Sequence, residues 1–196
     1  MATRAGALRR YVDMTEQEAN DLLAEAWSKH DEAWKQIETF GPGRMAAYCL
    51  EARGIDDDDS IGALTQEFEE ASINAGVAPV EHAKGTLVAL QSANIRLGLV
   101  CDTGFTPGRV VRNLLDEAGL CDYLEVLCFS DEVGVPKPGN EIFAKALAEL
   151  GARPPRRFTS ATSAAPTSQG PPTSACTRLA SRACTTTPRT PPTRPS

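Results

Sequence analysis

Histidine and aromatic residues are scarce in this sequence, and that scarcity excludes several kinds of site. The 196 residues include two histidines, His30 and His82, and only 6% are aromatic. A Ser–His–Asp triad or a histidine-based zinc centre therefore has little to be built from. The six cysteines form no Cys-x-x-Cys pair, and no histidine lies near them at ligand spacing. We interpret them as reduced thiols of a cytoplasmic protein.

Long apolar runs and an excess of positive charge are also missing. No stretch is long and apolar enough to span a membrane, and the N-terminal segment MATRAGALRRYVDM lacks the apolar region of a secretory signal. The formal net charge of −6 argues against a nucleic-acid partner. Hydrophobic residues make up 41% of the chain, which is enough for a packed core. Nothing in the sequence indicates an oligomeric state.

The composition changes sharply near residue 154. Residues 154–196 contain no Asp, Glu or Lys, so all 26 acidic residues lie before them. This last segment is rich in Thr, Ser, Ala, Pro and Arg and has no hydrophobic period. Such a composition cannot bury enough apolar area to offset its chain entropy, which predicts a disordered tail.

Residues 15–76 predict an all-helical block. Thr15 and Glu18 form a capping box ahead of an amphipathic helix, whose apolar face is marked by Leu23, Trp27, Trp34 and Ile37. We interpret the two tryptophans as core residues that pack a helix pair, rather than as a ligand-binding box. Gly-Pro-Gly at 41–43 ends this helix, and a second helix runs from about Arg44 to Ala52. The run of four Asp at 56–59 could suggest a metal site, but a loop that caps a third helix from Ser60 explains it better.

After residue 79 the pattern alternates between helix and strand. Apolar runs at 95–101 and 123–129 predict buried strands, and helices are predicted around them. Strands that alternate with helices indicate an α/β fold with a parallel sheet, in which function lies on the loops after the carboxyl ends of the strands. Two unusual loops occupy that position, Cys101–Gly104 and the segment SDEVGVPKPG at 130–139.

Lys137 is the strongest candidate for a functional residue. It lies between Pro136 and Pro138, which restrict the backbone around it. A lysine held in this way can present a fixed positive charge in a catalytic site, although a surface lysine in a proline-rich turn is the plainer alternative.

The two loops together resemble the haloacid dehalogenase (HAD) superfamily of hydrolases, most of which are phosphatases. RLGLVCDTGFTPGRV is similar to its second motif, and FSDEVGVPKPGNEIFAKAL to its third, including Gly134, Lys137–Pro138 and Ile142–Phe143. The helical block resembles the cap that many members insert between the first and second motifs. The resemblance implies a partial Rossmann-like core with a helical cap.

The resemblance also implies a chemistry and roles for particular residues. A family member attacks phosphorus with an Asp after the first strand, and Mg²⁺ neutralises charge on a small phosphorylated substrate. Lys137 would screen the nucleophile and the transferring phosphoryl group. The loop Cys101, Asp102, Thr103 and Gly104 would bind that group. Cys101 stands where Ser or Thr is usual and Asp102 where Asn is common, so Thr103 is the alternative hydroxyl, and Cys101 is equally well explained as a small buried residue.

Two motifs of the family are missing from the sequence. No Asp-x-Asp strand precedes the helices, since Asp13 follows no apolar strand, and we expect the first strand to have been lost. The Gly-Asp and second Asp that bind Mg²⁺ do not follow Leu150, so no metal ligand can be named in this chain. Read one frame out, however, residues 158–172 permit Gly-Asp followed by a second Asp, which indicates a frameshifted tail.

The expected organisation therefore has four parts. They are a disordered or remnant N-terminus at 1–14, a helical cap at 15–78, a partial α/β core at 79–153 and a disordered, frameshifted tail at 154–196. The expected function is that of a Mg²⁺-dependent phosphatase by resemblance, inactive as written. The alternative is a non-catalytic fragment or a helical protein-interaction module that uses the Trp27–Trp34 face.

Overall fold

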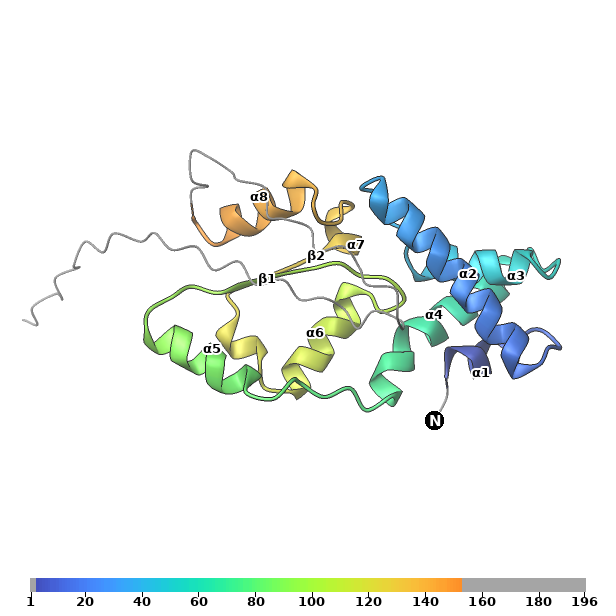
Figure 1. Cartoon of the computed structure of the whole chain (residues 1–196), viewed down its shortest axis with the longest axis horizontal. Coiled ribbons are helices and arrows are strands. Elements are labelled where there is room, and N and C mark those ends of the chain that lie inside the picture. Colours follow the sequence, from blue (N-terminus) through green and yellow to red (C-terminus); the bar gives the residue numbers. More distant parts are fainter. Residues whose placement is uncertain (1–2, 153–196) are drawn as a thin grey trace, which may run out of the picture.

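The computed structural model describes residues 3–152, which form a helical group followed by a small α/β group (Figure 1). The helical group contains α1 (Arg4–Leu8), α2 (Glu16–Lys35), α3 (Pro42–Glu51) and α4 (Asp58–Asn74). The α/β group contains α5 (Ala83–Ser92), β1 (Gly98–Cys101), α6 (Gly108–Glu117), a 3-10 turn (Cys121–Tyr123), β2 (Val126–Phe129), α7 (Ser130–Val133) and α8 (Asn140–Glu149). The frameshifted tail expected at 154–196 lies outside the described residues.

Two helix caps predicted from the sequence are confirmed, although the third helix starts at Asp58 rather than at Ser60. The Thr15 side chain accepts from the Glu18 backbone N–H, and the Glu18 carboxylate accepts from the Thr15 backbone N–H at 2.7 Å. Asp57, from the acidic run, accepts from the Ser60 backbone N–H at 2.9 Å and caps α4. These side chains satisfy N–H groups that the first turn of a helix cannot pair internally. Gly-Pro-Gly at 41–43 differs from expectation, because it starts α3, with Pro42 in its first turn, rather than ending α2.

The expectation of a disordered N-terminus is wrong from residue 4 onward. Helix α1 packs into the same apolar cluster as α2, α3 and α4, and Leu8 is fully buried. Arg4 fixes this helix, because its guanidinium donates to the Phe68 carbonyl and to the hydroxyls of Ser72 and Thr106. Burial lowers the pKa of the Arg4 guanidinium. The short α1 carries no amphipathic period, so a sequence pattern could not reveal it.

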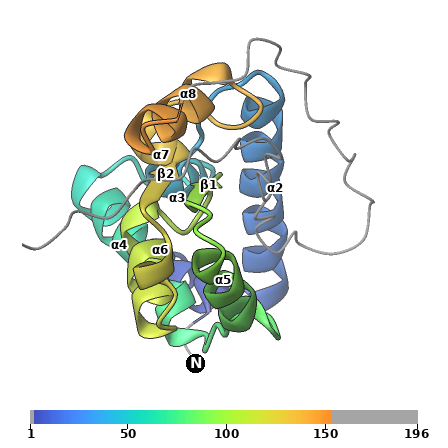
Figure 2. The same cartoon turned by 90° about the vertical axis from the view of Figure 1, so that its left-hand side faces the viewer.

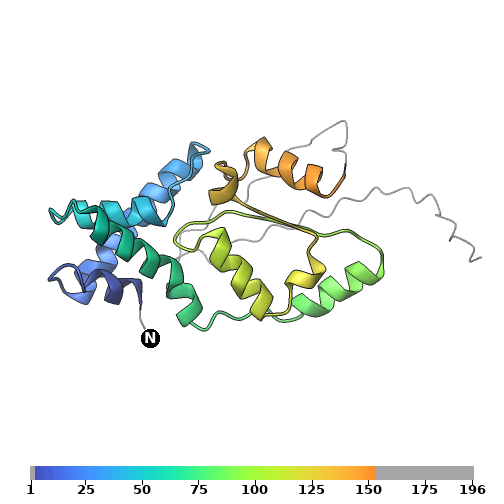
Figure 3. The ribbon, with the colours of Figure 1, turned by 180° about the vertical axis from the view of Figure 1, so that it is seen from behind.

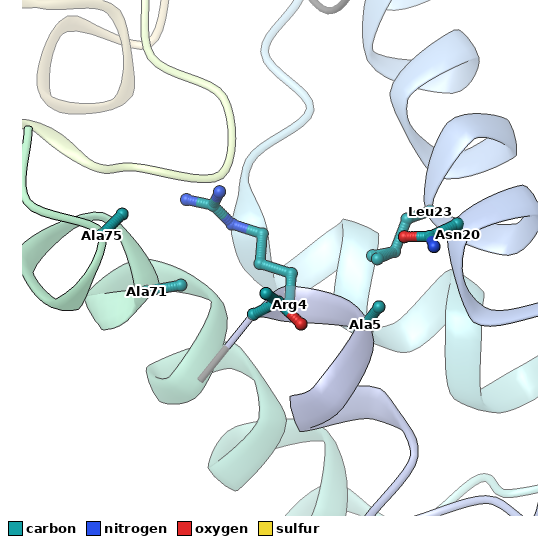
Figure 4. A pocket seen from close by; sticks show the side chains of 7 residues that line it. Arg4, Ala5, Asn20, Leu23, Ala71 and Ala75 are labelled. Carbon is teal, nitrogen blue, oxygen red and sulfur yellow. The ribbon is translucent and has the colours of Figure 1, made fainter. Parts of the chain in front are cut away.

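The Arg4 side chain extends from α1 between α2 and α4 (Figure 4). A cavity of about 260 Å³ lies beside it, and its lining residues come from α1, α2 and α4 and the residues that flank them. None of these lining residues belongs to the loops that follow the two strands. The cavity is thus lined by residues of the helical group, one of which, Arg4, also reaches Thr106 ahead of α6.

Helix α2 turns two different faces to its surroundings. Ala19, Leu22, Ala26 and His30 are buried in the core of the helical group. The stripe that the sequence indicated as the core face is less buried, and Ile37, just after the helix, is 44% exposed. The structure therefore corrects the interpretation of Trp34 as a core residue, whereas Trp27 does pack against the core. Trp27 packs on the core cluster and stacks on Phe105 at 5.8 Å, whereas Trp34 points to the α/β group.

The α/β group contains the predicted parallel sheet. Strands β1 and β2 pair in parallel with Gly98 opposite Val126 and Cys101 opposite Phe129. Helix α8 covers one face of the sheet, and α5 and α6 lie on the other side (Figure 2). Val100, Val126, Cys128, Ile142 and Ala146 form the core between the sheet and α8. Both strands are shorter than the apolar runs that predicted them.

The two groups meet where α4 contacts α6 and where the end of α2 lies near the loops that follow the strands (Figure 3). Arg4 contributes to this junction, because it reaches Thr106 and lies over the Phe105 ring at 4.9 Å. No helix within residues 3–152 is long and apolar enough to cross a membrane.

Replacing Arg4 tests this junction. Arg4→Ala removes one charged donor from three acceptors, and we expect it to lower the free energy of unfolding by about 2–3 kcal/mol. Lys29→Ala is the matched control, because Lys29 forms an exposed ion pair with Glu32 on the surface of α2, and such a pair contributes about 0.3–0.5 kcal/mol. Urea denaturation followed by circular dichroism measures both. Equal losses would show that Arg4 is an ordinary surface cation.

Candidate functional site

The two loops singled out from the sequence lie together at one edge of the sheet. Because the strands are parallel and Cys101 is opposite Phe129, the segments after both residues leave the sheet side by side. The first loop runs through Asp102 to Pro107 and leads into α6. The second passes through α7 and the Lys137 turn and leads into α8. The fold therefore brings the two sequence-predicted segments to one place.

Lys137 is bound to Asp102 of the other loop. The Lys137 backbone N–H donates to Asp102 Oδ1 at 2.8 Å, and its Nζ lies 3.9 Å from Asp102 Oδ2. Their side chains are 13% and 21% exposed, so this pair is sheltered but not closed off from solvent. Gly134, with a positive φ of 82°, ends α7 and turns the chain toward Lys137. The Lys137–Pro138 peptide bond is cis.

A second set of hydrogen bonds joins the beginnings of the two loops. Thr103 Oγ1 donates to Asp131 Oδ1 at 2.9 Å and lies 3.0 Å from Ser130 Oγ. The Thr103 backbone N–H donates to Ser130 Oγ, and the Asp131 N–H donates back to Thr103 Oγ1. The single hydroxyl proton of Thr103 is thus engaged by a carboxylate. A phosphoryl group would have to compete with Asp131 for it.

Asp131 also holds the start of α6. Both of its carboxylate oxygens accept from the Gly108 backbone N–H, at 3.2 and 3.0 Å. A side chain at Gly108 has no room, because a Cβ there would lie 2.6 Å from Phe129 Cγ. Negative charge at a helix N-terminus is favourable, so Asp131 caps a helix from a distant part of the chain. Ser130 and Asp131 were not predicted as site residues, although they directly follow a parallel strand.

Gly104 lies against the helical group. A Cβ at Gly104 would be 2.8 Å from Trp27 Cζ3 and 3.6 Å from His30 Cε1. His30 is itself fixed, since its Nδ1 lies 2.9 Å from the Phe40 carbonyl oxygen. Glycine at this position therefore permits a close approach between α2 and the first loop. Its predicted role, to let backbone amides approach a phosphate, stays a prediction.

Cys101 is 4% exposed and its Sγ donates to the Asp102 carbonyl at 3.3 Å. This geometry is compatible with a small buried residue at a strand end and also with a weak donor at the start of the loop. The four described cysteines are all free thiols. Burial raises the pKa of Cys49 to about 12, and burial also raises the pKa of Cys128, so both thiols stay protonated at neutral pH.

Helix α2 reaches both loops through the stripe that the sequence marked as apolar. Trp34 Nε1 donates to Asp102 Oδ2 at 3.1 Å. A Cβ at Gly139 would lie 3.1 Å from Ile37 Cγ2, so Ile37, just after α2, also lies close to the second loop. The Trp27–Trp34 face thus lies against the loops, and an interaction module would need another surface. Sequence reasoning found this stripe but not what it contacts.

The residues at this site do not form a metal centre. Residues 3–152 contain no group of three or more His, Cys, Asp or Glu side chains placed to hold an ion. Asp102 and Asp131 are carboxylates of the two loops, and each accepts from backbone and side-chain donors. The described part of the chain therefore does not fit Mg²⁺.

Comparisons with known proteins agree with the resemblance of the two loops. The model of a family described as haloacid dehalogenase-like hydrolase matches residues 12–158. Pyrimidine 5'-nucleotidase YjjG of Escherichia coli is 38% identical over 88 residues, which are 43% of this chain and 37% of that protein. The chain thus matches well under half the length of this relative.

The solved structures that this chain is similar to include a HAD phosphatase from Thermococcus onnurineus, with 20% identity and a TM-score of 0.49. This match covers 76% of the present chain and 61% of the other. L-2-haloacid dehalogenase from Xanthobacter autotrophicus has 18% identity and a TM-score of 0.47, with coverage of 78% and 60%. In both cases the chain spans less than two thirds of the solved protein.

Gly104 provides a test of the contact between α2 and the first loop. In Gly104→Ala the new methyl group meets the indole of Trp27, and we expect a loss of about 1–3 kcal/mol of unfolding free energy from overpacking. Gly62→Ala is the control, because Gly62 lies inside α4 with open space around its Cα, and it should gain about 0.5–1 kcal/mol. Both are measured by urea denaturation. A Gly104→Ala protein as stable as the parent would rule out the close approach.

Proposed function

The chain belongs to the haloacid dehalogenase-like hydrolase family, and from this premise we propose that its strand-end site binds the phosphoryl group of a small phosphate ester. The observation that carries the proposal is the position of Lys137. Its sheltered ammonium lies at the carboxyl edge of a parallel sheet, held by a backbone bond to Asp102 of the neighbouring loop. Such edges are where α/β sheets bind ligands.

The substrate class follows from the family and from one relative. The relative from Escherichia coli is named as a pyrimidine 5'-nucleotidase. We therefore propose a phosphomonoester of nucleotide size as the ligand class. The match spans 37% of that protein, so the proposed ligand is defined by its phosphate group and its approximate size.

The residues of this chain would bind the phosphoryl group through their positions and their charge. Lys137 would offset the negative charge of the phosphoryl oxygens, which is worth more in a sheltered site than in water. The loop from Cys101 to Gly104 would supply backbone donors, whereas the Thr103 hydroxyl proton stays bonded to Asp131. Asp131 would hold that loop in register with the second one, since it bonds both Thr103 and Gly108.

We propose that the chain as written does not turn over a phosphate ester. Phosphatases of this family need a carboxylate nucleophile and Mg²⁺. The carboxylates of Asp102 and Asp131 are both committed to donors that hold the loops, and residues 3–152 supply no metal cluster. Mg²⁺ dependence is therefore proposed for the family reaction, and residues 3–152 are given no part in binding the ion. The cap at 15–78, the core at 79–153 and the cytoplasmic location stay predictions.

Anion binding tests the proposed role of Lys137. We expect isothermal titration with inorganic phosphate to give saturable binding that Lys137→Ala weakens at least about tenfold, which corresponds to about 1.4 kcal/mol. Lys145→Ala is the matched control, because Lys145 lies on α8 in an exposed pair with Glu149 and should bind phosphate like the parent. If both variants weaken phosphate binding equally, the binding is a nonspecific electrostatic attraction and Lys137 has no special role. Absence of binding in the parent would overturn the proposed function.

The frameshift is tested at the level of the gene. Sequencing the locus across the codons for residues 151–159 should reveal a single-base slip that restores Gly-Asp and a second Asp downstream. An intact frame at these codons would remove this explanation of the tail composition and leave residues 154–196 as a genuine basic segment.

A further inference from the structure

Trp34 is a side chain through which the helical group touches the loop that precedes α6. It lies in the last turn of α2, and its indole N–H donates to Asp102 Oδ2. The other oxygen of the same carboxylate accepts the Lys137 backbone N–H. A continuous line of hydrogen bonds therefore runs from the helical group through Asp102 to Lys137.

The Asp102 carboxylate lies between these two donors and accepts one hydrogen bond on each of its oxygens. A carboxylate with one donor can rotate about its side-chain torsions, whereas a donor on each oxygen fixes its plane. The distances of 2.8 and 3.1 Å are those of well-formed hydrogen bonds. Without the Trp34 indole, only Asp102 Oδ1 would keep a neutral donor, the Lys137 backbone N–H. The turn at Lys137 would then lose its fixed relation to the first loop.

Trp27 and Ile37, which lie on the same stripe as Trp34, contact the loops through carbon atoms and not through a hydrogen bond. Trp27 meets Gly104 through its indole ring carbons, and Ile37 meets Gly139 through a methyl group. Trp27 Nε1 is buried and has no hydrogen-bond partner among the described residues. The two tryptophans thus differ in function within the same helix face. Trp27 packs through its ring carbons, and Trp34 donates a hydrogen bond to a carboxylate.

We propose that Trp34 is a positioning residue that acts through Asp102 to hold Lys137 in the geometry that binds a phosphoryl anion. This inference rests on the proposed function and adds to it a residue from the helical group. It makes anion affinity depend on how α2 is seated against the two loops. Trp34 touches Asp102 rather than the anion in this arrangement.

A double-mutant cycle with inorganic phosphate as the probe tests the inference. Trp34→Phe keeps an aromatic ring and removes the N–H, and we expect it to weaken phosphate binding about 5–10-fold. In Asp102→Asn the amide oxygen can still accept from Lys137, while the amide NH₂ faces the indole and cannot accept from it. Trp34→Phe should therefore change affinity less than about twofold when Asp102→Asn is already present, since the two residues act as one unit.

The indole resonances give a second measurement that does not need a folded Trp34 variant. The whole chain has two tryptophans, so a ¹H–¹⁵N spectrum shows two indole signals. Asp102→Asn should shift the signal of Trp34 and leave that of Trp27 in place, and phosphate should move the Trp34 signal in the parent protein. Stationary Trp34 signals in both experiments would overturn the inference.

The possible failures are distinguishable. If the parent binds no phosphate, the proposed function fails and the inference falls with it. If the parent binds phosphate and Trp34→Phe binds equally well, only the inference fails. If Trp34→Phe weakens binding equally with and without Asp102→Asn, Trp34 acts through general packing, and the positioning role is wrong.

Discussion

The arrangement of the site depends on the carboxylate of Asp131. This one side chain accepts from the Thr103 hydroxyl in the first loop and from the Gly108 backbone at the start of α6. Two segments of the chain thereby donate to one charged acceptor on a third segment, and charge-assisted bonds of this kind are stronger than neutral ones. Because the loops are fixed at their beginnings, the Lys137 turn further along the second loop can meet Asp102 in a defined geometry.

A second carboxylate performs a different task at the same edge. Asp102 connects the two loops to the helical group, while Asp131 connects the loops to each other. Both acids of the site therefore hold segments of the chain together. This explains how a family fold and a well-placed lysine can coexist with the proposed lack of turnover. In phosphoryl transfer by a covalent route, a carboxylate must be able to reach phosphorus, and these two are held by other partners.

Local signals in the sequence carried most of the fold that could be predicted. The Thr15–Glu18 box, the cap at Asp57 and both strands are recognisable within a few residues, and so is the restrained Lys137 turn. The features that could not be predicted depend on contacts between residues that are far apart in the sequence. Burial of α1 rests on Arg4 reaching Phe68 and Thr106, and the orientation of Trp34 rests on an acid in another group. No spacing rule encodes such partners, and the bond between the Thr103 hydroxyl and Asp131 could not be predicted for the same reason.

The stretch between the two cores has a consequence for how this chain can vary. From Ser72 to Leu99 no residue is buried, and Val77 and Val80 are 59% and 80% exposed. The apolar clusters on either side are built from residues outside this stretch. A change of length near residues 75–82 would displace no core side chain, because surface connections accept insertions more readily than packed elements do. Related chains are therefore free to differ here in length while keeping both cores and the strand-end loops intact.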